Sequence, residues 1–126
     1  MEYSIKFDKK EDLLVIKTEG TMNSLDYISM AQDILRYPDH RSGGNSVFDH
    51  RDLDFSHVRL EDLERIRAFH VKNEERIGSG KSAFLFGKGR AEAWIKLWSM
   101  GEKIKTSNRV RIFEDDVKML EWLKEK

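Results

Sequence analysis

The sequence predicts a single α/β domain over residues 1–126, built on a four- or five-stranded mixed sheet with helices on its faces. The predicted elements run strand, strand, helix, and then strand followed by helix three times. This alternation is typical of a mostly parallel sheet with right-handed crossovers. The first two strands are joined by a short charged turn, which indicates an antiparallel hairpin at the start of the sheet.

The composition excludes several classes of protein. Hydrophobic residues make up 39% of the chain and charged residues 37%, which predicts a compact core beneath a heavily charged surface. The 23 basic and 23 acidic side chains cancel, so no global field favours nucleic acid. The absence of cysteine excludes disulfides and thiolate chemistry. No secretory signal or run of ~20 apolar residues is recognised, and we expect a cytoplasmic protein with no membrane span.

The first third of the chain predicts two strands and a helix. Residues 3–7 alternate between apolar and polar, which is typical of a half-buried strand, and residues 13–19 form a better buried run closed by Gly20. Asn23 or Ser24 can cap the following helix, which Pro38 ends. The apolar stripe predicted for this helix consists of Leu25, Ile28, Ala31, Ile34 and Leu35.

The rest of the chain repeats the strand–helix unit. Residues 46–53 predict a buried central strand that ends in a charged turn, and a long helix follows from Leu60 to about Ile77. Residues 82–86 predict a second buried strand, followed by a helix from Ala91 to about Lys105. Residues 110–113 predict one more strand. Asp115 then caps a helix whose apolar residues are Val117, Leu120 and Leu123.

Order and spacing of several short motifs resemble the STAS-like domains, and more closely the small proteins similar to the stage II sporulation anti-sigma-factor antagonist. The motifs are Val47-Phe48-Asp49-His50-Arg51, Leu60-Glu61-Asp62-Leu63, Val110-Arg111-Ile112-Phe113 and Leu120-Glu121-Trp122-Leu123. The resemblance implies a non-enzymatic domain that binds partners, in some cases switched by phosphorylation of a serine after the third strand. It extends to lipid-transfer domains of related fold, which implies an apolar ligand.

Ser56 falls roughly where the phosphorylated serine of this family lies. The family's Asp-Ser-Ser/Thr-Gly-like signature is replaced here by Asp52-Leu53-Asp54-Phe55-Ser56, so the phosphorylation switch does not simply carry over. His57 and Arg59 are nearby charge partners for a phosphate. The alternative role for Ser56 is an ordinary turn or capping serine.

Four residues are candidates for a ligand or partner site at the carboxyl ends of the strands. Asp49 and Arg51 are two residues apart on one strand, so their side chains point to the same side and are expected to pair. Lys88 and Arg90 lie in a glycine-rich turn that opens a helix, where backbone N–H groups favour an anion. The alternative for this turn is a flexible connection that needs glycine.

Two histidine-containing arrangements have both a functional and a structural interpretation. Asp49, His50, Asp52, Asp54 and His57 contain metal-binding side chains, but they crowd one turn and alternate in direction. An acidic hydrogen-bonded turn is therefore favoured, and no metal is expected. His70 lies on the apolar stripe of the helix that begins at Leu60, where a hydrogen-bonded core histidine is favoured over a catalytic base.

The helix predicted from Ala91 to about Lys105 carries more apolar surface than one sheet can cover. The candidate interface residues are Trp94, Leu97, Trp98 and Met100. Such a surface is covered either by a neighbouring helix or by a partner, and a two-fold homodimer is the commonest partner arrangement.

From these observations we expect a regulatory or protein-interaction domain with no enzymatic activity and no cofactor. The alternative is a carrier or sensor of a small apolar or amphipathic ligand such as a lipid. An enzyme is the third and least favoured alternative, because few potential catalytic groups converge in the sequence.

Overall fold

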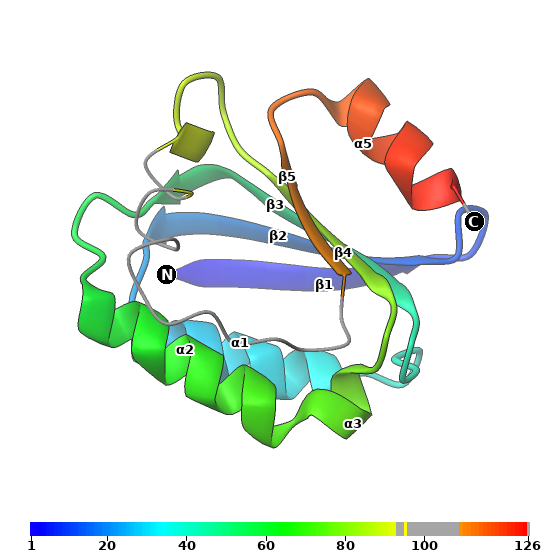
Figure 1. Ribbon diagram of the computed structural model, residues 1–126, viewed down its shortest axis with the longest axis horizontal. Helices are drawn as coiled ribbons and strands as arrows, with labels where there is room; N and C mark the ends of the chain where they lie inside the picture. Colours follow the sequence, from blue (N-terminus) through cyan, green and yellow to red (C-terminus); the bar gives the residue numbers. More distant parts are fainter. Residues whose placement is uncertain (93–94, 96–108, 126) are drawn as a thin grey trace.

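The computed structural model describes residues 1–92, 95 and 109–125 and contains one five-stranded sheet (Figure 1). The strands lie in the order of the chain: β1 (Glu2–Asp8), β2 (Leu13–Thr21), β3 (Asn45–Asp54), β4 (Lys81–Leu85) and β5 (Arg109–Phe113). β1 pairs with β2 antiparallel, and all the other pairs are parallel. The predicted mixed sheet with an antiparallel start is confirmed, and the runs at 47–48 and 83–84 are neighbours in it.

The helices cover both faces of the sheet. α1 (Ser24–Arg36) and α2 (Leu60–Lys72) lie on one face, and α5 (Asp116–Lys124) lies on the other (Figure 1). Crossovers between parallel strands are right-handed, so strands that follow one another in a single direction place their crossover helices on the same face. α5 follows the edge strand β5 and is not a crossover, which leaves it free to cover the opposite face.

α1 begins and ends where its sequence signals predict. The Asn23 side chain accepts hydrogen bonds from the backbone N–H groups of Leu25 and Asp26, at 2.9 and 3.2 Å. The helix ends before Pro38. Its predicted apolar stripe is partly wrong, because Leu25 is 68% exposed. The face that packs on the sheet is centred on Tyr27, Met30 and Ile34, and Leu25 points away from it.

The helix predicted from Leu60 to Ile77 is divided. α2 ends at Lys72, and a single-turn helix, α3 (Glu74–Ile77), follows it. The amide side chain of Asn73 donates a hydrogen bond to the carbonyl of Phe69 at 2.9 Å, which caps the end of α2. Asn73 itself leaves the helical conformation, with φ of −110° and ψ of 20°, so the helix is interrupted at this residue.

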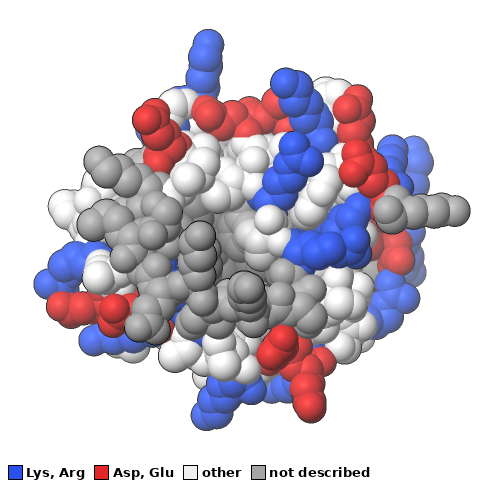
Figure 2. Space-filling model, in the orientation of Figure 1, with Lys and Arg blue, Asp and Glu red and all other residues white. Residues whose placement is uncertain are grey.

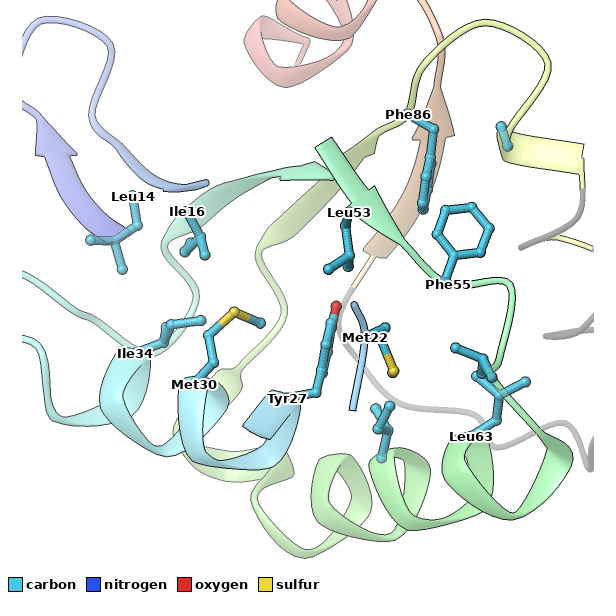
Figure 3. Close-up of a cluster of buried hydrophobic side chains, with 13 residues drawn as sticks. Leu14, Ile16, Met22, Tyr27, Met30, Ile34, Leu53, Phe55, Leu63 and Phe86 are labelled. Atoms are coloured by element: carbon cyan, nitrogen blue, oxygen red, sulfur yellow. The ribbon is translucent and has the colours of Figure 1, made fainter. Parts of the chain in front are cut away.

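Two apolar cores lie on the two faces of the sheet. The larger one packs between the sheet and the helices α1 and α2, and Figure 3 shows Ile16 and Leu53 of the sheet facing Met30 and Tyr27 of α1. The smaller one lies under α5 and consists of Leu13, Val47, Ala83, Leu85, Phe113, Met119 and Leu123. Of the apolar residues predicted for this helix only Leu123 is buried, since Val117 and Leu120 are 61% and 37% exposed.

Lys81 connects β4 to the C-terminal end of α5 through hydrogen bonds. It begins β4, and its side chain is almost fully buried. The Nζ atom donates hydrogen bonds to the backbone carbonyls of Trp122, at 2.7 Å, and Glu125. Carbonyls at a helix C-terminus lack partners within the helix and carry partial negative charge, so the ammonium group both pairs them and offsets the helix dipole.

The α1–β3 loop packs tightly against the turn before β4. Gly43 N–H donates to the Ile77 carbonyl at 3.1 Å, and Ser42 Oγ donates to the Glu75 carbonyl at 2.7 Å. A Cβ atom on Gly78 would lie 2.3 Å from Gly43 N, and one on Gly80 would lie 2.2 Å from Gly44 O. Only glycine at 78 and 80 allows this approach of two backbone segments.

Candidate functional site

The described residues leave an apolar cavity of about 150 Å³ between the sheet and the helices α1 and α2. Phe48 and Phe84, from β3 and β4, form part of its wall and stack with their ring centroids 4.6 Å apart. The other apolar lining residues are Phe7, Leu14, Ile28, Met30, Ala31, Ile34, Leu35, Ile66, Phe69, Ile77, Val110 and Ile112. Side chains from both core-facing helices and from strands across the sheet therefore border one apolar space.

Polar residues border the cavity at the amino-terminal ends of the parallel strands. They come from the β1–β2 turn and the α1–β3 loop, and include Asp12, Asp39, His40, Arg41 and Asn45. Asp12, Arg41 and Asn45 also line an adjoining polar pocket. Arg41 pairs with Asp12 at 2.6 Å. The cavity is therefore amphipathic, with an apolar interior and a charged border.

Burial and a nearby cation keep the histidine at this border neutral. His40 is half-buried; burial lowers its pKa most, and the positive charge of Arg76 lowers the pKa further. Below neutral pH an ordinary exposed histidine would gain charge. The lowered pKa makes the charged form of His40 less favourable than that of an ordinary histidine, and the other ionisable residues of the border are Asp12, Asp39 and Arg41.

His70, predicted as a core histidine, lies on the α2 wall of the cavity. Its Nε2 atom is buried, and among the described residues it has no hydrogen-bond partner. Burial lowers the pKa of His70, while the carboxylate of Glu74 partly opposes the shift. An unsatisfied buried polar atom is uncommon in proteins, and a water molecule or a ligand is one way to satisfy it.

His50 is fully buried in a hydrogen-bonded network on the same side of the sheet. Nδ1 lies 2.7 Å from Thr18 Oγ1, and Nε2 lies 2.9 Å from the Tyr27 hydroxyl. Thr18 Oγ1 also donates to the Asp49 carbonyl at 3.2 Å, so this hydroxyl accepts from Nδ1–H and the Tyr27 hydroxyl donates to Nε2. Burial lowers the pKa of His50 to about 3, although the Asp49 carboxylate opposes the shift. A histidine this acidic is structural and is not a base at neutral pH.

Asp49 and Arg51 form the predicted ion pair. The guanidinium donates from Nε at 2.9 Å and from Nη2 at 2.8 Å to the two oxygens of Asp49. Burial alone would raise the pKa of Asp49, but the hydrogen bonds and charge of Arg51 outweigh it and the pKa is lowered. The Asp49 side chain is 13% exposed and that of Arg51 is 49% exposed, so the pair is open to solvent on the arginine side.

Lys88 and Arg90 are exposed in the turn that follows β4, beside Arg51. A Cβ atom on Gly87 would lie 3.6 Å from Arg90 Cδ and 3.8 Å from the Arg51 carbonyl oxygen, so Arg90 lies near the backbone of Arg51. A shared ligand or partner site of Asp49, Arg51, Lys88 and Arg90 stays a prediction. The backbone N–H groups of this turn are candidates to bind an anion, but the Gly89 N–H donates a hydrogen bond to the carboxylate of Glu114. An external anion would compete with that internal one.

Ser56 is exposed in the turn between β3 and α2. Its backbone N–H donates to Asp54 Oδ1 at 2.9 Å, and this contact lowers the pKa of Asp54 most among the groups around it. The hydroxyl is therefore accessible, in a turn ordered by an aspartate. Its phosphorylation stays a prediction.

The remaining predictions concern interfaces, metals and membranes. Trp94, Leu97, Trp98 and Met100 lie outside the described residues, and the homodimer interface stays a prediction. Across residues 1–92 and 109–125, no three histidine or acidic side chains are grouped to hold a metal ion. In the same part of the chain, every helix is too short or too polar to cross a bilayer.

The sequence reasoning missed the cavity as a site, because it favoured the carboxyl ends of the strands. Ligand crevices form there where the strand order of a parallel sheet reverses. Here the parallel strands β2 to β5 run in one direction without reversal. The signals for the cavity were the glycine-rich loop before β3 and the histidine on the apolar face of α2.

The chain has a SpoIIAA-like α/β fold, as its comparison with solved structures shows. An uncharacterised protein of the DUF3478 family from Shewanella loihica PV-4, described as having a SpoIIAA-like fold, superposes with a TM-score of 0.61. The two chains are 19% identical, and the match covers 96% of this chain and 93% of that one. No protein-family model and no curated protein matches the sequence. The predicted STAS-like fold is confirmed.

Proposed function

We propose that this domain is a carrier or sensor that binds a small apolar or amphipathic molecule in the cavity between the sheet and α1–α2. The observation that carries the proposal is the apolar pocket of about 150 Å³ between the sheet and the helices α1 and α2. A ligand that fills it removes the apolar lining from water, so the hydrophobic effect favours binding of an apolar group.

The lining of the cavity favours binding over catalysis. Most lining side chains are apolar, and the polar ones are concentrated at the border, which is the usual distribution in a small-molecule site. His50 is held neutral by burial and is hydrogen-bonded through both ring nitrogens. The described residues thus provide apolar walls and polar hydrogen-bonding groups for a ligand. They do not pair a nucleophile with a general base in this cavity.

Native mass spectrometry of the protein purified from its own host tests this function. We expect a co-purifying small molecule in the wild type and its loss in Ala31→Leu, because Ala31 lines the cavity and a larger side chain fills it. Gln32→Leu on the exposed side of α1 is the matched control and should retain the molecule. An empty wild type, together with equal binding of apolar probes by both variants, would contradict the proposal.

A second candidate, a regulatory domain that binds a protein partner, is favoured by the exposed hydroxyl of Ser56 at the end of β3. A phosphate there would lie near His57 and Arg59 but also beside Asp54. The same mass spectra separate the two functions, since this candidate predicts a second polypeptide and one added phosphate group that is absent from Ser56→Ala.

A further inference from the structure

We propose that the occupant of the cavity is a small amphiphile with a carboxylate head, which binds Arg41 while its apolar part lies between the sheet and α1. This inference rests on the proposed ligand-binding function and adds the chemical class of the ligand. It follows from the size of the cavity and from the polar pocket that adjoins it.

The size of the cavity limits the apolar part of the ligand. An apolar protein cavity of 150 Å³ accommodates a single benzene ring, so about six carbons fit in this space. A long acyl chain would need several times that volume. The aromatic walls, Phe48 and Phe84, suit either a short chain or one ring.

Arg41 is the cation that both pockets share. It lines the apolar cavity and the polar pocket, so a head group beside it remains connected to an apolar part inside. Its present partner is Asp12, and the two side chains are 61% and 63% exposed. Such exposed pairs contribute little to stability, so a ligand carboxylate can replace Asp12 at small cost. The planar guanidinium also matches a carboxylate with two parallel hydrogen bonds.

Asn45 supplies a second hydrogen-bond donor beside Arg41. Its side-chain oxygen accepts from the Lys81 backbone N–H at 2.9 Å, which fixes the orientation of the amide. The amide nitrogen has no partner among the described residues, and Asn45 borders both pockets. Gly43 adds room, since a Cβ atom there would meet nothing within 4 Å.

The other charges at the border define the competing possibility. Asp12 and Asp39 line the cavity with Arg41, so an ammonium head could bind the carboxylates instead. A carboxylate is favoured because Arg41 and Asn45 both present donors, and because Arg76 lies near His40 on the same side. The two heads differ in charge, which makes the choice measurable.

Calorimetric titration of the full chain with hexanoate, hexan-1-ol and hexylammonium tests the head group. The three probes share one apolar part, and we expect hexanoate to bind about two- to fivefold more tightly than hexan-1-ol. Arg41→Gln should remove this preference while hexan-1-ol binding is retained. Asp12→Asn should strengthen hexanoate binding, because it removes the competing carboxylate. Arg36→Gln is the control, since Arg36 is exposed on α1 and does not line the cavity.

The outcomes separate this inference from the proposed function. Equal affinities for the three probes, or tightest binding of hexylammonium, overturn the carboxylate head and leave a ligand-binding cavity in place. A preference for hexanoate that survives in Arg41→Gln overturns the role of Arg41. If no probe binds and Ala31→Leu behaves as wild type, both the inference and the proposed function are wrong.

Discussion

At the scale of single residues, His50 links three elements through its side chain. Its Nε2 atom accepts a hydrogen bond from the Tyr27 hydroxyl of α1, and its Nδ1–H donates one to Thr18 Oγ1 of β2. The ring centroids of Phe48, Phe84 and Phe86 lie within 6 Å of the His50 ring centroid. Burial raises the pKa of Tyr27, as it lowers that of His50, so both groups stay neutral. A charge on either one would break the network.

His50 should make the folded state sensitive to acid. Its pKa is about 3 when folded and near 6.5 when unfolded, so its contribution is complete above pH 6.5 and is lost as the pH falls towards 3. We expect the free energy of unfolding to fall by about 1.4 kcal/mol per pH unit from this group between pH 6 and 4.5.

Urea denaturation across that pH range measures the effect. His50→Gln keeps a hydrogen-bonding side chain but does not titrate, so its stability should change less with pH than that of the wild type. Carboxylates and the other histidines contribute to both proteins and cancel in the difference. Parallel pH profiles would show that His50 is not the sensitive group.

The Asp49–Arg51 pair is open to solvent, and its contribution should be small. In a double-mutant cycle with Asp49→Asn and Arg51→Met, we expect a coupling of about 0.5–1 kcal/mol, because Arg51 is half exposed. Chemical denaturation of the four proteins gives the value. Purely additive losses would mean that the bidentate contact does not stabilise the fold.

At the scale of elements, the close contact of the α1–β3 loop with the turn before β4 should tolerate substitution unequally. Gly78 and Gly43 both have positive φ, at 78° and 83°, so alanine meets a similar backbone penalty of about 1 kcal/mol at each. At Gly78 the new Cβ also meets the Gly43 backbone at 2.3 Å, which should add about 1–3 kcal/mol. Equal losses of unfolding free energy for Gly78→Ala and Gly43→Ala would show that the loop moves aside freely.

The starts of α1 and α5 could be predicted better than the faces that these helices bury. Asn23 and Asp115 cap their helices as their side chains predict, because a cap depends on two or three neighbouring residues. Leu25 belongs to the apolar stripe that helical spacing predicts for α1, yet it is 68% exposed, and Leu120, an apolar residue of α5, is 37% exposed. Helical spacing alone could not identify the buried face of each helix, because Tyr27 and Met119 also fall at helical spacing. The contact with the sheet determines which face is buried.

The candidate site was harder to predict than the fold. Asp49 and Arg51 are neighbours on one strand, so period-two geometry predicts their pairing. The cavity is bordered by residues as distant as Phe7 and Ile112, and no local pattern brings these together. The role of Arg41 depends on how the α1–β3 loop lies against the β1–β2 turn, which only the tertiary structure defines.

At the scale of the whole molecule, the surface mixes both signs of charge. Figure 2 shows lysine and arginine side chains interspersed with acidic ones around the rim of the visible face. We therefore expect self-association to depend on apolar contacts at Trp94, Leu97, Trp98 and Met100. We expect sedimentation equilibrium to detect a dimer of the wild type and a monomer for Leu97→Glu with Met100→Glu. A wild-type protein that stays monomeric at high concentration would contradict this prediction.

The strands follow one another across the sheet in the same sequence as along the chain. Each new strand therefore finds its neighbour already present during synthesis on the ribosome, and the sheet can grow from the β1 edge towards β5. Val47, Ala83 and Leu85, which α5 covers, remain without that cover until the helix has emerged. A released chain that ends before residue 116 should consequently expose this apolar surface and bind chaperones, whereas the chain that includes α5 should not.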